Sequence, residues 1–253
     1  MNNDEILQTL TAMSHYVGAP DRGYAILGEG NTSARIDGDS MYIKASGTAL
    51  GTMKPADFLA VSISKVTDIL DEPNATDDDV RENLRAALLD PREERLPSVE
   101  TVMHALLYEY GEYNFIAHTH PVACGGLLCS VNAKEAMLGR VCPDQIVVMG
   151  RASVFVPYVD PGLALAREVR DRVRQFVEEE NEPPKAITLE NHGVFALGPT
   201  AKSVMNITDM AEKMAYVLLG AYSAGGPKFM TEKDIDRIAT RPDEKYRQKL
   251  IGG

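Results

Sequence analysis

Amphipathic helices give the clearest pattern along the chain. Residues 4–17 place apolar side chains at positions 6, 7, 10 and 13, which is the spacing of one helical face. The run Gly18-Ala19-Pro20 predicts the end of this helix. Similar patterns predict helices over residues 161–180 and 200–220.

A further helix is predicted to open at Pro97-Ser98 and to run to about Tyr110. Ser98 is suited to the N-cap position, because its hydroxyl can accept a hydrogen bond from a free amide of the first turn. Glu100 then falls in the first turn, where the positive end of the helix dipole favours a carboxylate.

Short apolar runs separated by turn residues predict the β-strands of the fold. These runs lie at residues 33–36, 40–45, 58–62, 114–120 and 185–197. The Asp37-Gly38 pair lies between the first two runs and predicts an antiparallel hairpin.

Residues 71–95 are dense in charge and interrupt this pattern. They contain one short helical patch, at residues 80–89. We therefore expect an exposed insertion rather than part of the core, and we assign it no chemistry.

Composition and charge narrow the class of protein. With 253 residues, 44% hydrophobic and 25% charged, the chain is predicted to form a single α/β domain over residues 1–253. The formal net charge of −11 would repel a phosphate backbone, so we expect no nucleic-acid partner.

No apolar run approaches about 18 residues, and the acidic start lacks a basic leader, so we expect neither membrane insertion nor secretion. Three cysteines without a C-x-x-C pair favour a reduced cytoplasm and argue against a cysteine-rich zinc site.

Three histidines form the candidate chemical centre. His118 and His120 are two residues apart on a predicted strand, so both rings project from one face and can reach the same ion. Alone, such a pair is more often two exposed polar positions. His192 interrupts an apolar run, where an unpaired imidazole would be costly; it is either a satisfied core histidine or a ligand. Together the three match a metal site with three nitrogen ligands and one open position.

Five motifs occur in sequence order between residues 28 and 198. They are Gly28-Glu29-Gly30-Asn31-Thr32-Ser33, Lys44-Ala45-Ser46-Gly47-Thr48, Leu96-Pro97-Ser98-Val99-Glu100, His118-Thr119-His120-Pro121 and Glu190-Asn191-His192-Gly193. With these motifs the chain resembles the class II aldolase/adducin family, which includes L-fuculose-1-phosphate aldolase. The resemblance implies a three-layer α/β/α fold around a largely antiparallel central sheet. It also implies a homotetramer with active sites at the subunit interfaces.

The resemblance implies a role for each matching residue. The implied metal ligands are His118, His120 and His192. The ion would be Zn²⁺, although Mn²⁺, Co²⁺ or Fe²⁺ suit the same donors. Glu100 looks like the catalytic acid/base. The implied phosphate-binding positions are Asn31, Ser46, Gly47 and Ser98.

Simpler interpretations of several motifs stay open. Ser98 could be only a helix cap, and Ser46-Gly47 only a hairpin turn. Gly28-x-Gly30 lacks the third glycine of the dinucleotide fingerprint, so we do not expect NAD binding. His104 lies four residues after Glu100 and could orient that carboxylate, but it is treated as a core histidine and not as a ligand.

Two departures from the family pattern concern the substrate. Ser98-Val99-Glu100 has one serine where sugar-phosphate aldolases commonly have two, so one phosphate donor is missing. Several aldolases use a tyrosine from an adjacent subunit to protonate the leaving fragment, but residues 143–148 contain none. The candidate substitutes are Tyr158, Tyr246 and Asp144.

The activity implied by the resemblance is that of a carbon–carbon lyase acting on a small sugar phosphate or sugar acid. The first candidate activity is that of an aldolase that cleaves a phosphorylated ketose by retro-aldol chemistry through a metal-bound enediolate. Decarboxylation of a β-keto sugar acid is the next alternative, before dehydration and epimerisation. Glu100 favours the first two, because the epimerases usually carry Asp there. A non-catalytic module like the adducin heads is disfavoured, because those lack the histidines present here.

Overall fold

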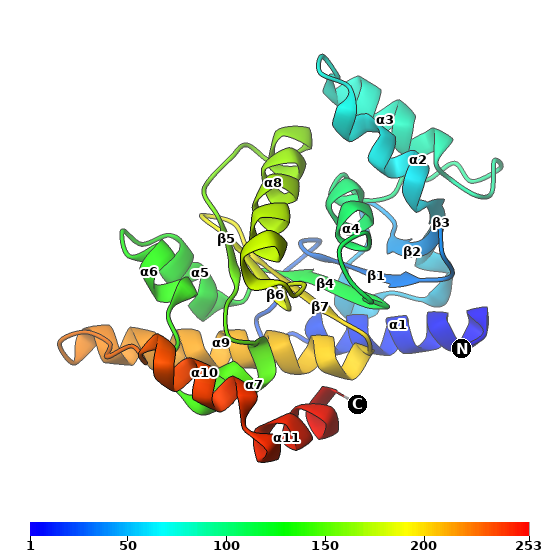
Figure 1. The fold of residues 1–253 in the computed structure, drawn as a ribbon. Coiled ribbons are helices and arrows are strands. Elements are labelled where there is room, and N and C mark those ends of the chain that lie inside the picture. Colours follow the sequence, from blue (N-terminus) through cyan, green and yellow to red (C-terminus); the bar gives the residue numbers. More distant parts are fainter. Residues whose placement is uncertain (253) are drawn as a thin grey trace.

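A seven-stranded sheet lies at the centre of the computed structural model, which describes the backbone of residues 1–252 and the side chains of residues 1–247 (Figure 1). The strand order is β3-β2-β1-β4-β7-β6-β5, and all neighbours are antiparallel except the parallel pair β5 and β6. The strands are β1 Asn31–Arg35, β2 Ser40–Lys44, β3 Phe58–Ser62, β4 Phe115–Thr119, β5 Val154–Val156, β6 Ala186–Leu189 and β7 Val194–Gly198. The expected hairpin across Asp37-Gly38 is confirmed, with Ser33 opposite Ile43.

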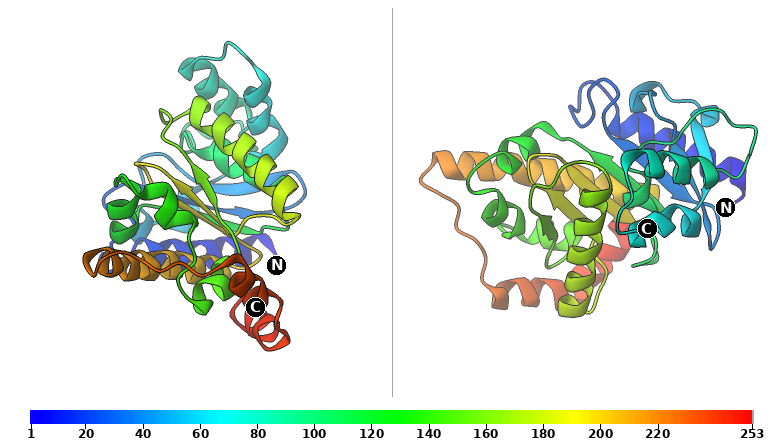
Figure 2. Two further views of the ribbon diagram at one scale, coloured as in Figure 1. Left: turned by 60° about the vertical axis from the view of Figure 1, so that its left-hand side comes forward. Right: turned by 90° about the horizontal axis from the view of Figure 1, so that it is seen from above.

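Helices cover both faces of the sheet (Figures 1 and 2). One layer holds α2 Ile63–Thr67, α3 Asp77–Ala86, α4 Thr101–Leu107 and α8 Leu163–Glu180. The opposite layer holds α1 Asn3–Val17, α5 Val122–Leu128, α7 Pro143–Met149 and α9 Ala201–Ser223. α6 Ala133–Leu138 packs on α5 and β5, and α10 Glu232–Thr240 and α11 Pro242–Gly252 pack on α7. Short 3-10 turns are η1 Leu50–Thr52, η2 Pro55–Asp57 and η3 Asp68–Asp71. The expected α/β/α layers around a mostly antiparallel sheet are confirmed.

Alternation along the strands supplies both helical layers with apolar partners. Ile116 and Phe195 face the layer of α4 and α8, whereas Ala117 and Val194 face the layer of α1 and α9. All five residues of β4 are buried. Burying one such large apolar side chain stabilises the fold by about 1.5–3 kcal/mol. The strand that carries His118 is therefore held on both faces by packed core.

The charged insertion is more integrated than its composition predicts. Within residues 71–95, Val80 and Leu84 of α3 are buried in the core beside α2, and Leu88 forms a β-bridge with Val61 of β3. The expectation of an insertion outside the core is wrong for this part. The reason is amphipathicity: the many charges occupy the outer face of α3 and leave an apolar inner face.

Two predicted elements also differ from the structure. The run at 185–197 is not one strand but the hairpin β6–β7, with a turn at residues 190–193. The helix expected from Ser98 begins instead at Thr101, with Glu100 at its N-cap position. Ser98 instead ends the extended segment beside β2, where its backbone N–H donates to the carbonyl of Lys44, and it starts a turn in which its carbonyl accepts the N–H of Thr101 and its hydroxyl that of Glu100.

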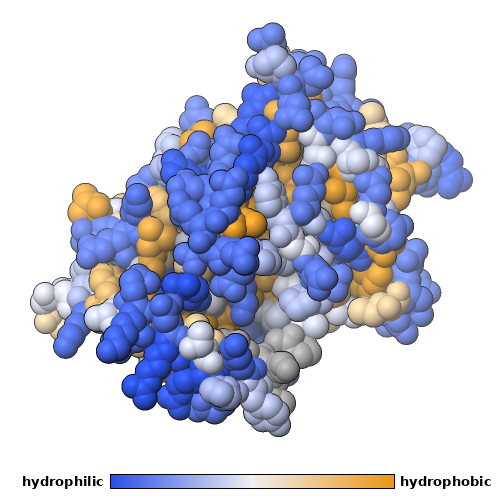
Figure 3. Space-filling view, viewed as in Figure 1, coloured by the Kyte–Doolittle hydropathy of each residue, from blue (hydrophilic) through white to orange (hydrophobic). Residues whose placement is uncertain are grey.

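The molecular surface over α8 is mainly hydrophilic, as the space-filling view shows (Figure 3). Apolar residues of that helix, such as Val169 and Val173, point into the core. Within residues 1–252, no helix combines the length and the apolar character needed to cross a membrane.

Candidate active site

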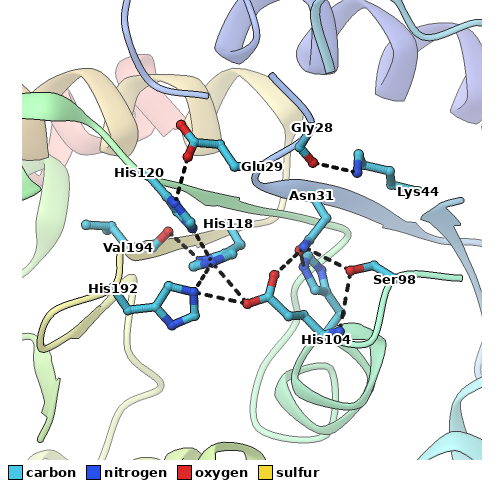
Figure 4. A network of polar contacts seen from close by, with 11 residues as sticks. Gly28, Glu29, Asn31, Lys44, Ser98, His104, His118, His120, His192 and Val194 are labelled. Carbon is cyan, nitrogen blue, oxygen red and sulfur yellow. Dashed lines mark hydrogen bonds and ion pairs between the residues drawn. The ribbon is translucent and has the colours of Figure 1, made fainter. Parts of the chain in front are cut away.

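The end of β4 presents the first two histidines. His118 is fully buried, its ring stacks on Phe195 with centroids 4.4 Å apart, and its Nδ1 donates to the carbonyl of Val194 at 3.3 Å. His120 follows the strand, and its backbone N–H donates to the carbonyl of Tyr24 at 2.7 Å. Both rings lie on the same side of the strand end (Figure 4). The two rings share one side, as the H-x-H spacing predicts, and their role as metal ligands stays a prediction.

The third histidine lies in the tight turn between β6 and β7. Leu189 N donates to the carbonyl of Gly193 at 2.8 Å, and His192 N donates to the carbonyl of Leu189 at 3.1 Å. Asn191 adopts a left-handed conformation with φ of 55°, which asparagine tolerates better than most residues. The turn brings the ring of His192 against those of His118 and His120.

Gly193 is required by the close approach of this turn to β4. A Cβ atom at this position would lie 2.6 Å from the carbonyl oxygen of Thr119 and 2.7 Å from Cδ2 of His120. Because the first neighbour is backbone, we expect Gly193→Ala to lower the free energy of unfolding by about 1–3 kcal/mol. Gly38→Ala is the matched control, since its Cβ would meet nothing within 4 Å. Urea denaturation checks the comparison, and equal stability of the two variants would contradict it.

The nitrogen atoms of the three histidines converge on one point. Nε2 of His118 lies 3.0 Å from Nε2 of His120 and 3.3 Å from Nε2 of His192. Two ligand nitrogens bound tetrahedrally to one zinc ion are separated by roughly 3.3 Å. Burial and the neighbouring His118 lower the pKa of His120 to about 3, so its ring is neutral and has a lone pair for a metal. The donor set fits a divalent transition-metal ion.

The carboxylate of Glu100 closes the fourth side of this cluster. Its Oε1 lies 3.4 Å from Nε2 of His118 and 3.2 Å from Nε2 of His192. Its Oε2 accepts a hydrogen bond from Nδ2 of Asn31 at 2.5 Å, and the same amide donates to Oγ of Ser98 at 3.2 Å. Burial raises the pKa of Glu100, but the interactions with His118, His192 and Asn31 outweigh it and hold the pKa well below its usual range. Glu100 is therefore an ionised, oriented carboxylate.

A buried chain of hydrogen bonds fixes Asn31, the residue that donates to the Glu100 carboxylate. Burial and the neighbouring His118 lower the pKa of His104 to about 3, so the ring of His104 is neutral. Its Nε2–H donates to Oδ1 of Asn31, and its Nδ1 accepts from Ser33 at 2.7 Å. The hydroxyl of Tyr108 in turn donates to Ser33 Oγ at 2.9 Å. His104 is thus linked to Glu100 by hydrogen bonds through Asn31, a link that the sequence spacing did not reveal.

Among the candidate anion-binding residues, Asn31 and Ser98 contact the cluster or each other, whereas Ser46 lies against Leu96 of the segment that leads to Ser98. The backbone N–H of Ser46 donates to Leu96 and that of Ser98 donates to Lys44, so neither amide is free. Gly47 has a φ of 80° and faces open space. An anion here would depend on the hydroxyls of Ser46 and Ser98 more than on the backbone donors expected from the sequence, because Nδ2 of Asn31 already donates to Glu100 and to Ser98.

The side chains of the three candidate substitutes for the leaving-group tyrosine have partners or exposure of their own, away from the contacts of the cluster. The hydroxyl of exposed Tyr158 donates to Asp160, and Asp144 forms an ion pair with Arg247 at 2.8 Å. Tyr246 is exposed. Among the contacts of residues 1–247, none joins these three side chains to the histidines or to Glu100.

Glu29 and Lys44 belong to the site region and were not singled out from the sequence. Oε2 of Glu29 lies 3.3 Å from Nδ1 of His120, and the Lys44 ammonium donates to the carbonyl of Gly28 at 3.2 Å (Figure 4). Burial lowers the pKa of Lys44. For Glu29, the sequence offered one signal: a charged residue between Gly28 and Gly30, in the motif that also carries Asn31.

Comparisons with known proteins agree with this arrangement. A family model described as "Class II Aldolase and Adducin N-terminal domain" matches residues 8–219. The Bacillus subtilis protein named "Uncharacterized oxidoreductase YuxG" is 26% identical over 97% of this chain, which spans about a third of that relative, 34% of its length. The 3-oxo-tetronate 4-phosphate decarboxylase of Haemophilus influenzae is 24% identical over 87% of this chain and 90% of its own. The L-fuculose phosphate aldolase of Methanococcus maripaludis is 25% identical over 77% and 87%, respectively.

A solved structure of L-fuculose 1-phosphate aldolase has the same fold. It superposes with a TM-score of 0.69 at 20% sequence identity, and 96% of each chain is covered.

Proposed function

Because this chain belongs to the class II aldolase and adducin family, we propose that it is a metal-dependent aldolase cleaving a phosphorylated ketose by retro-aldol chemistry. The observation that carries the proposal is the convergence of three imidazole nitrogens with one ionised carboxylate. His118, His120 and His192 would hold Zn²⁺, or Mn²⁺, Co²⁺ or Fe²⁺. Such an ion, when bound, polarises a carbonyl and stabilises negative charge on oxygen.

The residues around this centre supply the proton chemistry. Oε1 of Glu100 lies on the side of the histidines, where it can take up or return the proton at the carbon of an enediolate fragment. Asn31 holds the other oxygen, and His104 holds Asn31, so the carboxylate keeps one orientation. Fixing a catalytic group in this way lowers the entropic cost of reaching the transition state.

A substrate screen tests the proposed reaction. Metal-loaded protein is incubated with phosphorylated ketoses and β-keto sugar acids, and released aldehyde and carbon dioxide are measured. We expect an aldehyde from a ketose phosphate, with loss of the product after chelation. Failure of the whole ketose phosphate set, with carbon dioxide from a β-keto acid, would replace the aldolase assignment by a decarboxylase.

The decarboxylase is the second candidate because of two observations. A relative named 3-oxo-tetronate 4-phosphate decarboxylase aligns with 87% of this chain and 90% of its own length. The chain also has Val99 between Ser98 and Glu100, and the exposed side chain of Val99 provides no donor for an anion. Both reactions pass through an enediolate, so the same histidines and Glu100 would serve either.

Phosphate recognition is open to a separate test. If the hydroxyls of Ser98 and Ser46 hold a substrate phosphate beside Asn31 and Gly47, inorganic phosphate should inhibit competitively. Ser98→Ala should then raise the inhibition constant several-fold, because a hydrogen bond to a charged group contributes about 1.5–3 kcal/mol. Ser130→Ala is the control, because the hydroxyl of this serine bonds only within its own turn, donating to the carbonyl of Leu127 and accepting from the backbone N–H of Asn132. A wild-type protein insensitive to phosphate would favour a substrate without phosphate at this position.

We also propose that residues 1–253 form one domain that assembles as a homotetramer with sites near the subunit interfaces. Exposed apolar side chains lie close to the candidate centre in sequence: Ile26 and Leu27 precede Glu29, and Val122 follows His120. Such side chains are typical of a surface covered in an assembly. Analytical ultracentrifugation measures the oligomeric state, and a monomer at micromolar concentration would contradict the proposal.

A further inference from the structure

We infer that Glu29 is a positioning residue for His120: its carboxylate sets the orientation and tautomer of this ring so that Nε2 faces the proposed metal. The inference rests on the proposed metal site. Oε2 of Glu29 lies 3.3 Å from Nδ1 of His120, on the ring edge opposite Nε2. Nε2 is the atom that lies 3.0 Å from Nε2 of His118. A proton on Nδ1, shared with the carboxylate, leaves the lone pair on Nε2.

The two oxygens of Glu29 have different partners. Oε1 accepts the backbone N–H of Ile26 at 2.6 Å, which fixes the side chain against its own loop. Oε2 is left for His120. The carboxylate is therefore held in place before any metal arrives, and reorienting it towards solvent would break a hydrogen bond.

The loop that carries Glu29 is itself anchored on both sides. The buried Lys44 donates its ammonium proton to the carbonyl of Gly28. Gly30 adopts a φ of 70°, and a Cβ atom there would lie 2.8 Å from the carbonyl oxygen of His118. The loop thus packs against the strand of His118 at a distance that only glycine allows, which places Glu29 above His120 (Figure 4).

The Nδ1 atoms of His118 and His120 have different partners, and this difference gives Glu29 a specific effect on the basicity of His120. Nδ1 of His118 donates to a neutral backbone carbonyl, that of Val194. Nδ1 of His120 instead faces an anionic carboxylate, which raises the basicity of the imidazole and strengthens its bond to a metal. Among the described residues, Glu29 is the side-chain carboxylate found beside the Nδ1 atom of a histidine in this cluster.

The test measures metal affinity and not only activity. Wild type, Glu29→Ala, Glu29→Gln and the control Glu168→Gln are stripped of metal, and Zn²⁺ affinity is measured by competition with a chromophoric chelator. Glu168 lies on α8 in an ion pair with Arg172 at 2.7 Å, so its variant matches the change in charge. We expect Glu29→Ala to weaken Zn²⁺ binding about 10–100-fold. Glu29→Gln should recover part of the loss, because an amide oxygen can still accept the Nδ1 proton.

Two further measurements separate positioning from a structural role. The Co²⁺-loaded Glu29→Ala protein should show a shifted ligand-field spectrum, because the His120 ring is no longer fixed. Without metal, Glu29→Ala should unfold within about 1.5 kcal/mol of wild type, because it loses one hydrogen bond, to the backbone N–H of Ile26. Wild-type affinity in Glu29→Ala, or a large loss of metal-free stability in that variant, would overturn the inference while leaving the metal site intact. Absence of Zn²⁺ binding by wild type would overturn the metal site as well.

Discussion

Replacing His192 by alanine should empty the metal site and abolish turnover. Purified without chelator, the wild-type protein should hold about one transition-metal ion per chain, because three convergent imidazoles bind such an ion tightly. His192→Ala leaves two nitrogens on one strand end, and His118→Ala removes the ring that contacts both others. Since changes beyond the ligands already cost 10–100-fold in affinity, loss of a ligand should cost more than about 100-fold.

Elemental analysis of the purified variants checks this result. His15→Ala is the matched control: it removes the same side chain from an exposed position on α1, where the ring contacts the carbonyl of Met53. The control should retain the wild-type metal content. Full metal content in both His118→Ala and His192→Ala would rule out the ligand assignment. Adding excess chelator to wild type should remove activity, and Zn²⁺ or Mn²⁺ should restore it.

The sequence predicted the parts of the site that depend on local geometry. The two-residue spacing of His118 and His120 places both rings on one face of any strand, and β4 has this geometry. The third histidine was placed on a strand because its neighbours are apolar. The chain turns there instead, since Asn191 adopts a left-handed conformation and Gly193 allows close contact with β4. Neither effect is visible in the hydrophobic pattern.

Relations between distant segments could not be predicted in the same way. Ser98 has the chemistry of a helix cap, but residues 98–101 form a separate turn beside β2, so the helix starts later and Glu100 takes the N-cap position. The sequence spacing left His104 as a core histidine that could orient Glu100 from one helical turn away. Its ring instead bonds to Asn31 on β1, and that amide bonds to the carboxylate. These contacts depend on how α4 packs on the sheet, which one-dimensional spacing does not encode.

Exchanging Glu100 for glutamine should remove catalysis and leave the fold in place. Glutamine keeps the size of the side chain and can still accept the hydrogen bond from Nδ2 of Asn31. It cannot carry a proton between the reacting carbon and water. We therefore expect the variant to fold and bind metal, and turnover to fall roughly 10²–10⁴-fold, the contribution usual for general acid–base catalysis. Glu168→Gln, far from the histidines on α8, should turn over at the wild-type rate.

The specific signature of this role is proton exchange in the absence of cleavage. Incubated in D₂O with the ketone product fragment alone, wild type should incorporate deuterium at the enediolate carbon, as followed by NMR, and Glu100→Gln should not. The expectation follows from Oε1 of Glu100, which lies 3.2 Å from His192 Nε2 and so borders the position that a substrate bound at this centre would occupy. If the variant exchanged deuterium at the wild-type rate, Glu100 would only close or shape the metal site. The base would then be sought at Asp144 and Tyr158, although neither contacts the histidines among the described contacts.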